Sequence, residues 1–232
     1  MDKTLIFTAT YNESENIISF IKLIENLNLE LDLLIIDDNS PDNTWKLVKK
    51  YSVHKKFINL IIRDSKKGLD SAHKYAYTFA KEKKYKYLIT LDADLSHDPL
   101  IIPEILKNLQ NNDFVIGSRY INGGECDMKG FRRALSIMGN KVIKYVLKIN
   151  CNEFTTSYRG FNLIKLEDFD LNIVKSKGYS FFMETIYQLN KKKKQIKEIP
   201  IIFKDRQKGK SKIPKVEIFR TFVNLFITKL LR

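Results

Sequence analysis

The stretch Leu88-Ile89-Thr90-Leu91-Asp92-Ala93-Asp94-Leu95-Ser96-His97 carries the strongest structural signal in this sequence. A short apolar run with strand-forming residues ends in two carboxylates, Asp92 and Asp94, which are one residue apart. Ligands of α/β proteins bind beyond the carboxyl ends of the strands. Two carboxylates at such a place suit Mg²⁺ or Mn²⁺ that carries phosphate oxygens, although acidic pairs also cap helices.

Strand-like and helix-like segments alternate around this stretch. Strands are expected at Lys3–Thr10, Leu31–Asp38, Ile58–Asp64, Tyr87–Leu91 and Phe114–Ser118. Helices are expected between and after them, at Ser14–Leu27, Asp42–Tyr51, Gly68–Glu82 and Pro99–Asn108, with Ser14 as a candidate cap. This order predicts an α/β fold with a mostly parallel central sheet and helices on both faces.

The alternation becomes less regular after Tyr120. The expected elements are a long helix at Phe131–Lys148, strands at Phe154–Leu163 and Lys197–Phe203, and a helix at Phe181–Asn190. Pro200 lacks the amide hydrogen that a ladder needs, so the last of these strands is expected at an edge of the sheet.

The C-terminal part of the chain is basic and ends in an amphipathic segment. Residues 190–232 contain 14 Lys and Arg but 3 Asp and Glu, and they carry most of the net charge of +14. This balance suggests a polyanionic partner, such as nucleic acid, an anionic membrane or a phosphorylated substrate. The spacing of apolar residues in Val216–Arg232 predicts a helix that either docks on the core or lies in a membrane interface.

The amino-acid composition limits the classes of protein to which this chain can belong. The 232 residues, 44% of them hydrophobic, suffice for one large α/β domain or two small ones. Cys126 and Cys151 are too few for a disulfide framework, and no Cys/His cluster suggests zinc, so a reducing cytosol is the expected compartment. The first residues do not resemble a signal peptide, and no apolar run reaches the roughly 18 residues of a spanning helix.

Four further signals follow expected strands. They are Thr8–Glu13, Ile35–Asp42, Lys67–Ala72 and Gly117–Tyr120. The first offers Tyr11 and Glu13 to a base and a ribose, and the third opens a helix whose N-terminus can face phosphate. Three of them also have an ordinary interpretation. Thr8–Glu13 could be a helix-capping turn, and in Ile35–Asp42 either Asp38 or Ser40 could cap the next helix with Asp42 in its first turn. Arg119 could be a surface charge.

In this order and spacing the signals resemble the nucleotide-sugar-binding half of inverting family 2 glycosyltransferases. The resemblance narrows to dolichyl- and polyprenyl-phosphate mannosyltransferases and covers nearly the whole chain. The narrower match rests on residues 92–99 (Asp-Ala-Asp-Leu-Ser-His-Asp-Pro), 117–120, 176–181 (Ser-Lys-Gly-Tyr-Ser-Phe), 198–201, 205–206 and 209–212.

The resemblance implies a fold, a division of the chain and a set of site residues. The fold is of the GT-A type, with a catalytic domain over 1–212, divided into a nucleotide-sugar half (1–120) and an acceptor half (121–212), and a C-terminal helix over 213–232. The residues implied for the donor are Ala9, Tyr11, Glu13, Ile36, Asp38, Asp92, Ala93 and Asp94. The catalytic set is Asp94, Asp92 and Arg119, with Asp94 and Asp92 on the metal. The acceptor phosphate is assigned to Arg119, Arg132, Ser136, Arg206 and Lys212, beside Asn140.

The activity implied is transfer of mannose from GDP-mannose to dolichyl or polyprenyl phosphate with Mg²⁺ or Mn²⁺. The protein is then expected to be cytoplasmic and peripheral, on the cytosolic face of an anionic membrane. Whether it also needs a small membrane-spanning subunit as a partner is left open. Ala9, Asn39 and Phe182 stand where the family usually has Pro, Gly and Gln, and Thr155–Arg159 also departs from its pattern, which leaves the donor sugar open.

Other functions remain as alternatives. UDP-glucose or a UDP-N-acetylhexosamine is the second choice of donor, and a non-catalytic membrane-associated module is the alternative of another class. A dinucleotide oxidoreductase is excluded because Thr8–Glu13 contains no glycine. A nucleic-acid-binding protein would explain the basic tail but not the acidic strand ends, so no nucleic acid is expected.

Overall fold

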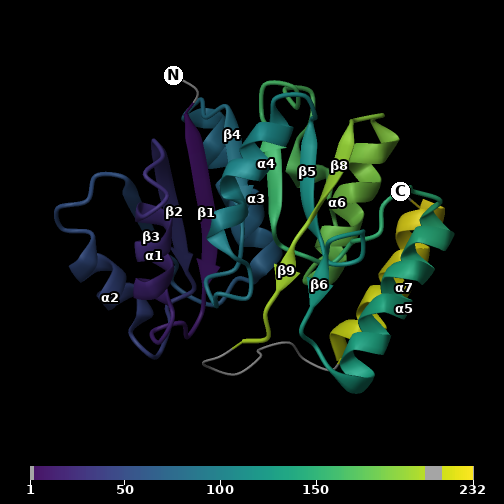
Figure 1. The fold of residues 1–232 in the computed structure, drawn as a ribbon, viewed down its shortest axis with the longest axis horizontal. Coiled ribbons are helices and arrows are strands. Elements are labelled where there is room, and N and C mark those ends of the chain that lie inside the picture. Colours follow the sequence, from purple (N-terminus) through teal and green to yellow (C-terminus); the bar gives the residue numbers. More distant parts are fainter. Residues whose placement is uncertain (1–2, 207–215, 232) are drawn as a thin grey trace.

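One seven-stranded sheet forms the centre of the molecule (Figure 1). The structure is a computed structural model that describes residues 3–206 and 216–231. The strands lie in the order β3-β2-β1-β4-β7-β5-β8. Their bounds are β1 Thr4–Thr10, β2 Leu31–Asp37, β3 Ile58–Ile62, β4 Tyr87–Thr90, β5 Phe114–Ser118, β7 Arg159–Asn162 and β8 Ile196–Pro200. All neighbouring pairs are parallel except those of β7, which runs antiparallel to β4 and β5, so the prediction of a mostly parallel sheet is confirmed.

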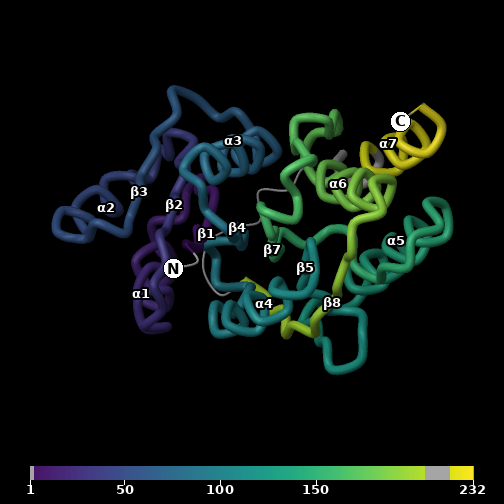
Figure 2. The backbone as a smooth tube through the Cα atoms, turned by 90° about the horizontal axis from the view of Figure 1, so that it is seen from above, coloured from purple at the N-terminus to yellow at the C-terminus, as the bar shows by residue number. Residues whose placement is uncertain are grey.

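Helices cover both faces of the sheet, as the sequence predicts (Figure 2). They are α1 Ile17–Glu25, α2 Thr44–Tyr51, α3 Leu69–Glu82, α4 Ile102–Leu109 after a 3₁₀ turn at Pro99–Ile101, α5 Gly130–Leu147, α6 Tyr179–Lys191 and α7 Val216–Leu231. Successive strand side chains point to opposite faces. Leu5 and Phe7 therefore join α3 and α6 in one apolar cluster, whereas Ile6 joins α1 and α4 in another.

Several predicted boundaries differ from the structure because side chains distant in sequence determine where an element begins. The first helix begins at Ile17, and the amide of Ser14 donates to Asp42, so Ser14 is not its cap. The strand expected from Phe154 begins only at Arg159, because the preceding loop bends toward the carboxyl ends of the sheet. The strand expected at Lys197–Phe203 is divided in two.

The division occurs at Ile201, between β8 and the short β9 (Ile202–Phe203). β8 is the edge strand of the main sheet, as Pro200 predicts, whereas β9 pairs with β6 (Glu125–Cys126) in a separate ribbon. The Ile201 amide donates to Ser118 O at 3.1 Å and its carbonyl accepts from Glu125 N at 3.0 Å. Ile201 therefore fixes the crossing from one sheet to the other.

The terminal helix α7 docks on the domain. Asn224 donates to Ser180 of α6 at 2.9 Å, and Leu225 and Thr228 are buried. α7 also lies against α5 (Figure 2). Among the helices that the structure describes, none is long and apolar enough to cross a membrane. The domain boundary predicted at residue 212 lies outside the described residues.

Candidate active site

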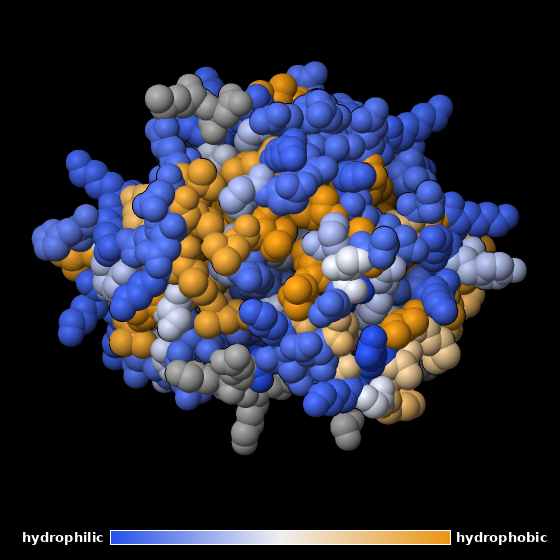
Figure 3. Space-filling view, viewed as in Figure 1, coloured by the Kyte–Doolittle hydropathy of each residue, from blue (hydrophilic) through white to orange (hydrophobic). Residues whose placement is uncertain are grey.

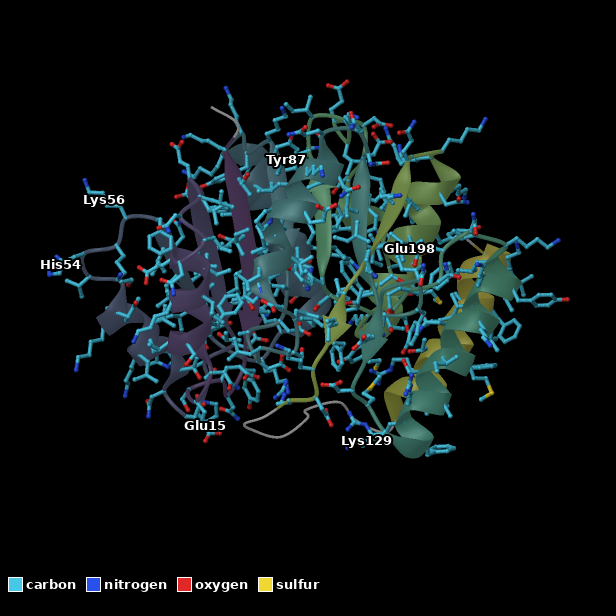
Figure 4. All side chains as sticks on the ribbon, in the orientation of Figure 1. Glu15, His54, Lys56, Tyr87, Lys129 and Glu198 are labelled. Atoms are coloured by element: carbon cyan, nitrogen blue, oxygen red, sulfur yellow. The ribbon has the colours of Figure 1, made fainter. Side chains whose placement is uncertain are left out.

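The two carboxylates of the 88–97 stretch lie at the edge of the sheet where the parallel strands end. β4 ends at Thr90, and the Leu91 amide extends its pairing to Phe7 O at 3.1 Å. The chain then turns through Leu95, whose φ is 63°. Figure 4 shows Glu15 and Lys129 toward this edge of the molecule and Tyr87, at the start of β4, toward the opposite one. The position predicted for the carboxylates is therefore confirmed.

The turn holds its two carboxylates differently. Asp94 Oδ1 accepts from Ser96 N at 3.0 Å and from Ser96 Oγ at 2.6 Å, and the Asp94 side chain is 9% exposed. The Asp92 side chain is 42% exposed. Asp94 is thus fixed by its own turn, whereas Asp92 depends on contacts from other elements for its orientation.

Arg206 supplies a positive charge to this carboxylate cluster. Its Nη2 and Nε donate to Asp94 Oδ2 at 2.6 and 2.9 Å, and its Nη1 donates to Glu13 Oε1 at 3.3 Å. The guanidinium therefore lies between carboxylates that follow β1 and β4. Together with Asp92, this arrangement places three carboxylates around one cation.

The charges have opposite effects on the two aspartates. Partial removal of water, together with the negative charge of Asp94, raises the pKa of Asp92. Burial also raises the pKa of Asp94, but the hydrogen bonds from Ser96 and the charge of Arg206 outweigh it and hold that pKa below its usual range. Asp94 is therefore the carboxylate that stays ionised most readily.

The donor residues implied by the resemblance have varied surroundings. Ile36 and Ala93 are 1% and 2% exposed, so they could reach a ligand only through their backbone. Ala9 is partly buried beside the apolar cluster. Lys66 Nζ lies 4.2 Å from the centre of the Tyr11 ring, which places a cation on the face offered to a base.

Asp38 holds a loop in place. Its carboxylate pairs with Arg63 and accepts from the amides of Lys67 and Gly68, each at 3.2 Å. The start of α3, which the sequence suggested for phosphate, therefore already faces a carboxylate. Asp38 does not cap α2, and Ser40 does not either, because its amide and hydroxyl bind Asp37, each at 2.7 Å. Asp42 accepts from the amide of Thr44, the first residue of α2.

A buried ion pair that the sequence did not indicate joins Arg119, which follows β5, to Glu153 in the loop before β7. Arg119 Nε and Nη2 donate to the two oxygens of Glu153 at 2.7 and 2.8 Å, and Nη2 also donates to Thr155 Oγ1 at 2.9 Å. Glu153 is fully buried. Burial would raise its pKa, but the charge and hydrogen bonds of Arg119 lower it below the usual range.

Arg119 still borders a cavity of about 320 Å³, which is lined by Tyr120, Arg133, Ile137 and residues 124–127 as well. A second cavity of about 730 Å³ shares Cys126, Asp127 and Arg133 with it and is also lined by Met128, Lys129, Lys204 and Asp205. Together the two cavities are lined by four basic side chains (Arg119, Lys129, Arg133 and Lys204) and three acidic ones (Glu125, Asp127 and Asp205), beside the segment that carries Arg206. The sequence did not single out Arg133, which lines both.

The remaining acceptor residues are placed as follows. Arg132 is exposed and does not line either cavity. Ser136 Oγ and the Tyr120 hydroxyl are 2.6 Å apart, and Asn140 Oδ1 accepts from Phe154 N at 2.8 Å. Arg206 reaches Asp94, and Lys212 lies outside the described residues.

Metal binding can be tested against these residues. Within residues 3–206 and 216–231, no group of three or more His, Cys, Asp or Glu side chains is arranged to hold a metal by itself. Mg²⁺ is usually bound by one or two carboxylates together with water and substrate phosphates. Asp92 and Asp94 fit that requirement, and the Arg206 guanidinium shows that their site already accommodates a cation.

Two solved structures with this fold contain a nucleotide or a nucleotide-sugar. A glucosyl-3-phosphoglycerate synthase from Mycobacterium tuberculosis, solved with UDP, has a TM-score of 0.70 at 13% identity and covers 98% of this chain and 80% of its own. A mannosyltransferase from Pyrobaculum calidifontis, solved with GDP-Man and Mn²⁺, has a TM-score of 0.57 at 14% identity, with 98% and 70% covered. The fold is therefore that of GT-A glycosyltransferases.

The model of "Glycosyl transferase family 2" matches residues 5–169, which is more than half of the chain. The chain belongs to this family and is a glycosyltransferase. An undecaprenyl-phosphate mannosyltransferase of Micrococcus luteus is 31% identical over 91% of this chain and 87% of its own. A polyprenol monophosphomannose synthase of Mycolicibacterium smegmatis is also 31% identical, over 91% and 81%. A dolichol-phosphate mannosyltransferase of Pyrococcus furiosus is 29% identical, over 97% and 63%.

Proposed function

We propose that this glycosyltransferase moves mannose from GDP-mannose to a polyprenyl or dolichyl phosphate. The observation that carries the proposal is the Asp92–Asp94 pair beyond β4, which faces the cation position held by Arg206. The related proteins support the choice of sugar and acceptor, because their names describe transfer of mannose to lipid phosphates.

The reaction requires an oxygen of the lipid phosphate to attack the anomeric carbon while the bond to the diphosphate breaks and GDP leaves. A divalent ion on Asp92 and Asp94, when bound, would neutralise charge on the leaving diphosphate. The attacking phosphate is already anionic at pH 7, so the site does not need a strong general base. Its main task is to hold the two reactants in line.

The arginine and lysine side chains in the two cavities are the candidates for binding the acceptor phosphate. Arg119 and Arg133 line the smaller cavity, and Arg133 and Lys204 line the larger one. Charge-assisted hydrogen bonds from arginine to phosphate are strong and directional. We place the acceptor phosphate there, between the donor side of the site and the start of α5. Arg206 would exchange its contact with Asp94 for one with phosphate once donor and metal arrive.

The outer surfaces of α5 and α7 suit a membrane that presents the lipid acceptor. On α7, Phe222, Phe226 and Leu230 are 47%, 47% and 77% exposed, on the side away from the buried Leu225 and Thr228. Phe219 lies in the part of α7 whose side chains are not described. An exposed apolar stripe with flanking cations is typical of interfacial helices.

The neighbouring α5 repeats this pattern. Its residues Phe131, Met138 and Tyr145 are spaced seven apart and are 80%, 58% and 84% exposed, and apolar surface is visible over α5 in Figure 3. α5 contains four Lys and Arg and no Asp or Glu. We therefore propose peripheral attachment to the cytosolic face of an anionic membrane, with or without a small membrane-spanning subunit.

The deciding experiment is a donor screen with the full-length protein, polyprenyl phosphate and Mn²⁺. GDP-mannose, UDP-glucose and UDP-N-acetylglucosamine are compared, each with and without excess chelator. We expect mannosyl phospholipid from GDP-mannose alone. A product from a UDP-sugar would favour the alternative donor, and absence of any product with all three donors would favour a non-catalytic binding module.

A further inference from the structure

A buried histidine lies next to the two carboxylates. His97 is 2% exposed, and its Nδ1 atom lies 3.4 Å from the backbone nitrogen of Asp92. The same Nδ1 atom is 3.8 Å from Asp92 Oδ2. On the other side of the ring, Nε2 is 3.2 Å from Thr156 Oγ1. The imidazole thus connects the carboxylate turn with the loop that precedes β7.

These contacts determine which ring nitrogen carries the proton. The Asp92 amide can only donate, so Nδ1 must be its unprotonated acceptor. The hydrogen of a neutral imidazole is then on Nε2 and points to Thr156 Oγ1, which also accepts from Tyr158 N at 3.2 Å. One accepting and one donating ring nitrogen is the pattern of a neutral imidazole.

Two aromatic rings pack against the imidazole. The Tyr158 and Phe203 rings are centred 5.2 and 5.6 Å from the His97 ring. Tyr158 is itself anchored through its hydroxyl, which donates to Asp98 O at 2.9 Å. Phe203 belongs to β9, and the next residue, Lys204, donates its amide to Ser96 O at 3.1 Å. His97 therefore packs between the carboxylate turn and the strand that leads to Arg206.

We propose that His97 is a positioning residue that fixes the orientation of Asp92 through the backbone amide of that residue. Asp94 is held by Ser96 of its own turn, whereas the Asp92 side chain is 42% exposed and its neighbours, His97 and Ser157, come from outside the two residues that follow it. Outer groups that orient metal ligands typically change metal affinity by about 10- to 100-fold when they are replaced. The inference rests on the proposed use of Asp92 as a metal ligand.

Two substitutions of His97 distinguish the contact made by Nδ1 from the contact made by Nε2. In His97→Asn, the amide oxygen takes the place of Nδ1 and can still accept from Asp92 N. In His97→Gln, the amide nitrogen takes the place of Nε2 and can contact Thr156, but nothing accepts from Asp92 N. Mn²⁺ is titrated into the full-length protein, and its binding is followed by electron paramagnetic resonance. We expect His97→Asn to bind Mn²⁺ almost as tightly as wild type. We expect His97→Gln to bind it about 10- to 100-fold more weakly.

His73 is the matched control, because it is 4% exposed and packs against Phe7 with ring centroids 5.0 Å apart. His73→Asn and His73→Gln should change Tm without separating the two variants in Mn²⁺ affinity. If the two His97 variants bind Mn²⁺ equally, whether both well or both poorly, His97 has only a packing role and the proposal is wrong.

A second measurement does not depend on metal or turnover. The chain has three histidines, so ¹⁵N imidazole spectra of the metal-free protein can be assigned by substitution. We expect the His97 Nδ1 to be unprotonated and Nε2 to carry the hydrogen. A hydrogen on Nδ1 would overturn the proposal even if the enzyme is active. If the tautomer is as expected but wild type binds no Mn²⁺, the proposed function fails while the contact with Asp92 stands.

Discussion

Arg206 and Asp94, which are 112 residues apart in the chain, form an ion pair with a shortest contact of 2.6 Å at the carboxyl end of the sheet. The guanidinium occupies the side of Asp94 that a metal would need. Arginine and metal should therefore compete for the same carboxylate, although both belong to the proposed reaction.

The first prediction follows from this competition. Arg206→Ala should bind Mn²⁺ about tenfold more tightly, since one charge-assisted interaction of roughly 1.5 kcal/mol no longer has to be displaced. Turnover should fall at the same time, because the acceptor phosphate loses a cation. Calorimetry with Mn²⁺ checks the affinity, and Arg220→Ala on the exposed part of α7 controls for loss of one positive charge. Weaker Mn²⁺ binding in Arg206→Ala would contradict the competition.

The second prediction concerns the carboxylates themselves. Asp94→Ala should lower turnover at least ~100-fold, the effect of removing one main electrostatic stabiliser. Excess chelator should abolish wild-type activity, and Mn²⁺ should restore it. Asp168→Ala, at a carboxylate far from the site that pairs with Lys194, is the control. Full activity of Asp94→Ala, or of wild type in chelator, would exclude metal assistance through this residue.

The third prediction concerns the pair of Arg119 and Glu153. Glu153→Gln leaves a buried arginine without its counter-charge and should lower the free energy of unfolding at pH 7 by about 3–5 kcal/mol. The folded-state pKa of Glu153 lies below its usual 4.5. Its contribution is therefore complete above the unfolded pKa and is lost as the pH falls through the folded one.

Denaturant titrations at several pH values test this dependence. The difference between wild type and Glu153→Gln should be constant at neutral pH and should narrow below about pH 4.5. Glu30→Gln, at an exposed glutamate, should match wild type throughout. A difference that widens on acidification would show that the pair does not lower the pKa of Glu153.

The fourth prediction concerns the membrane. Full-length protein should float with anionic vesicles and dissociate at high salt, since each cation near the surface adds about 1 kcal/mol. Replacing Phe131, Met138 and Tyr145 by Ser should weaken flotation, and truncation before Val216 should weaken it further. Replacing Val53, Leu100 and Ile164, which are 68%, 66% and 61% exposed elsewhere, is the matched control. Equal flotation of all variants would exclude α5 and α7 as the contact.

The parts of the fold that the sequence predicts are those set by local patterns. Apolar runs such as Leu5–Phe7 and Leu33–Ile36 determine the strands, and Asp92 and Asp94 follow such a run directly. The antiparallel direction of β7 was not predictable, because it depends on pairing with β4, about 70 residues earlier in the chain. The loop before β7 is likewise held by contacts to distant residues.

The site shows the same distinction. Glu153 pairs with a residue 34 positions away and carries no local signal of that role. The family resemblance implies Arg132 for the acceptor, and the neighbouring Arg133 is the residue that lines the two cavities. Adjacent residues on a helix point about 100° apart, so a shift of one residue in the phase of α5 is enough to exchange them. His97 belongs to the motif at residues 92–99, but its contact with Thr156 is visible only in the tertiary structure.

The crossing at Ile201 limits how far Arg206 can travel. The backbone amide of Lys204 is hydrogen-bonded to Ser96 O, so Arg206 lies two residues beyond an anchored point of the chain. Two residues span at most about 7 Å when fully extended. In the proposed reaction the guanidinium would therefore move from a carboxylate to a phosphate while its backbone stays close to this anchored point. A counterion held in this way would stay beside the site throughout the proposed reaction, and its change of partner would require no movement of the sheet.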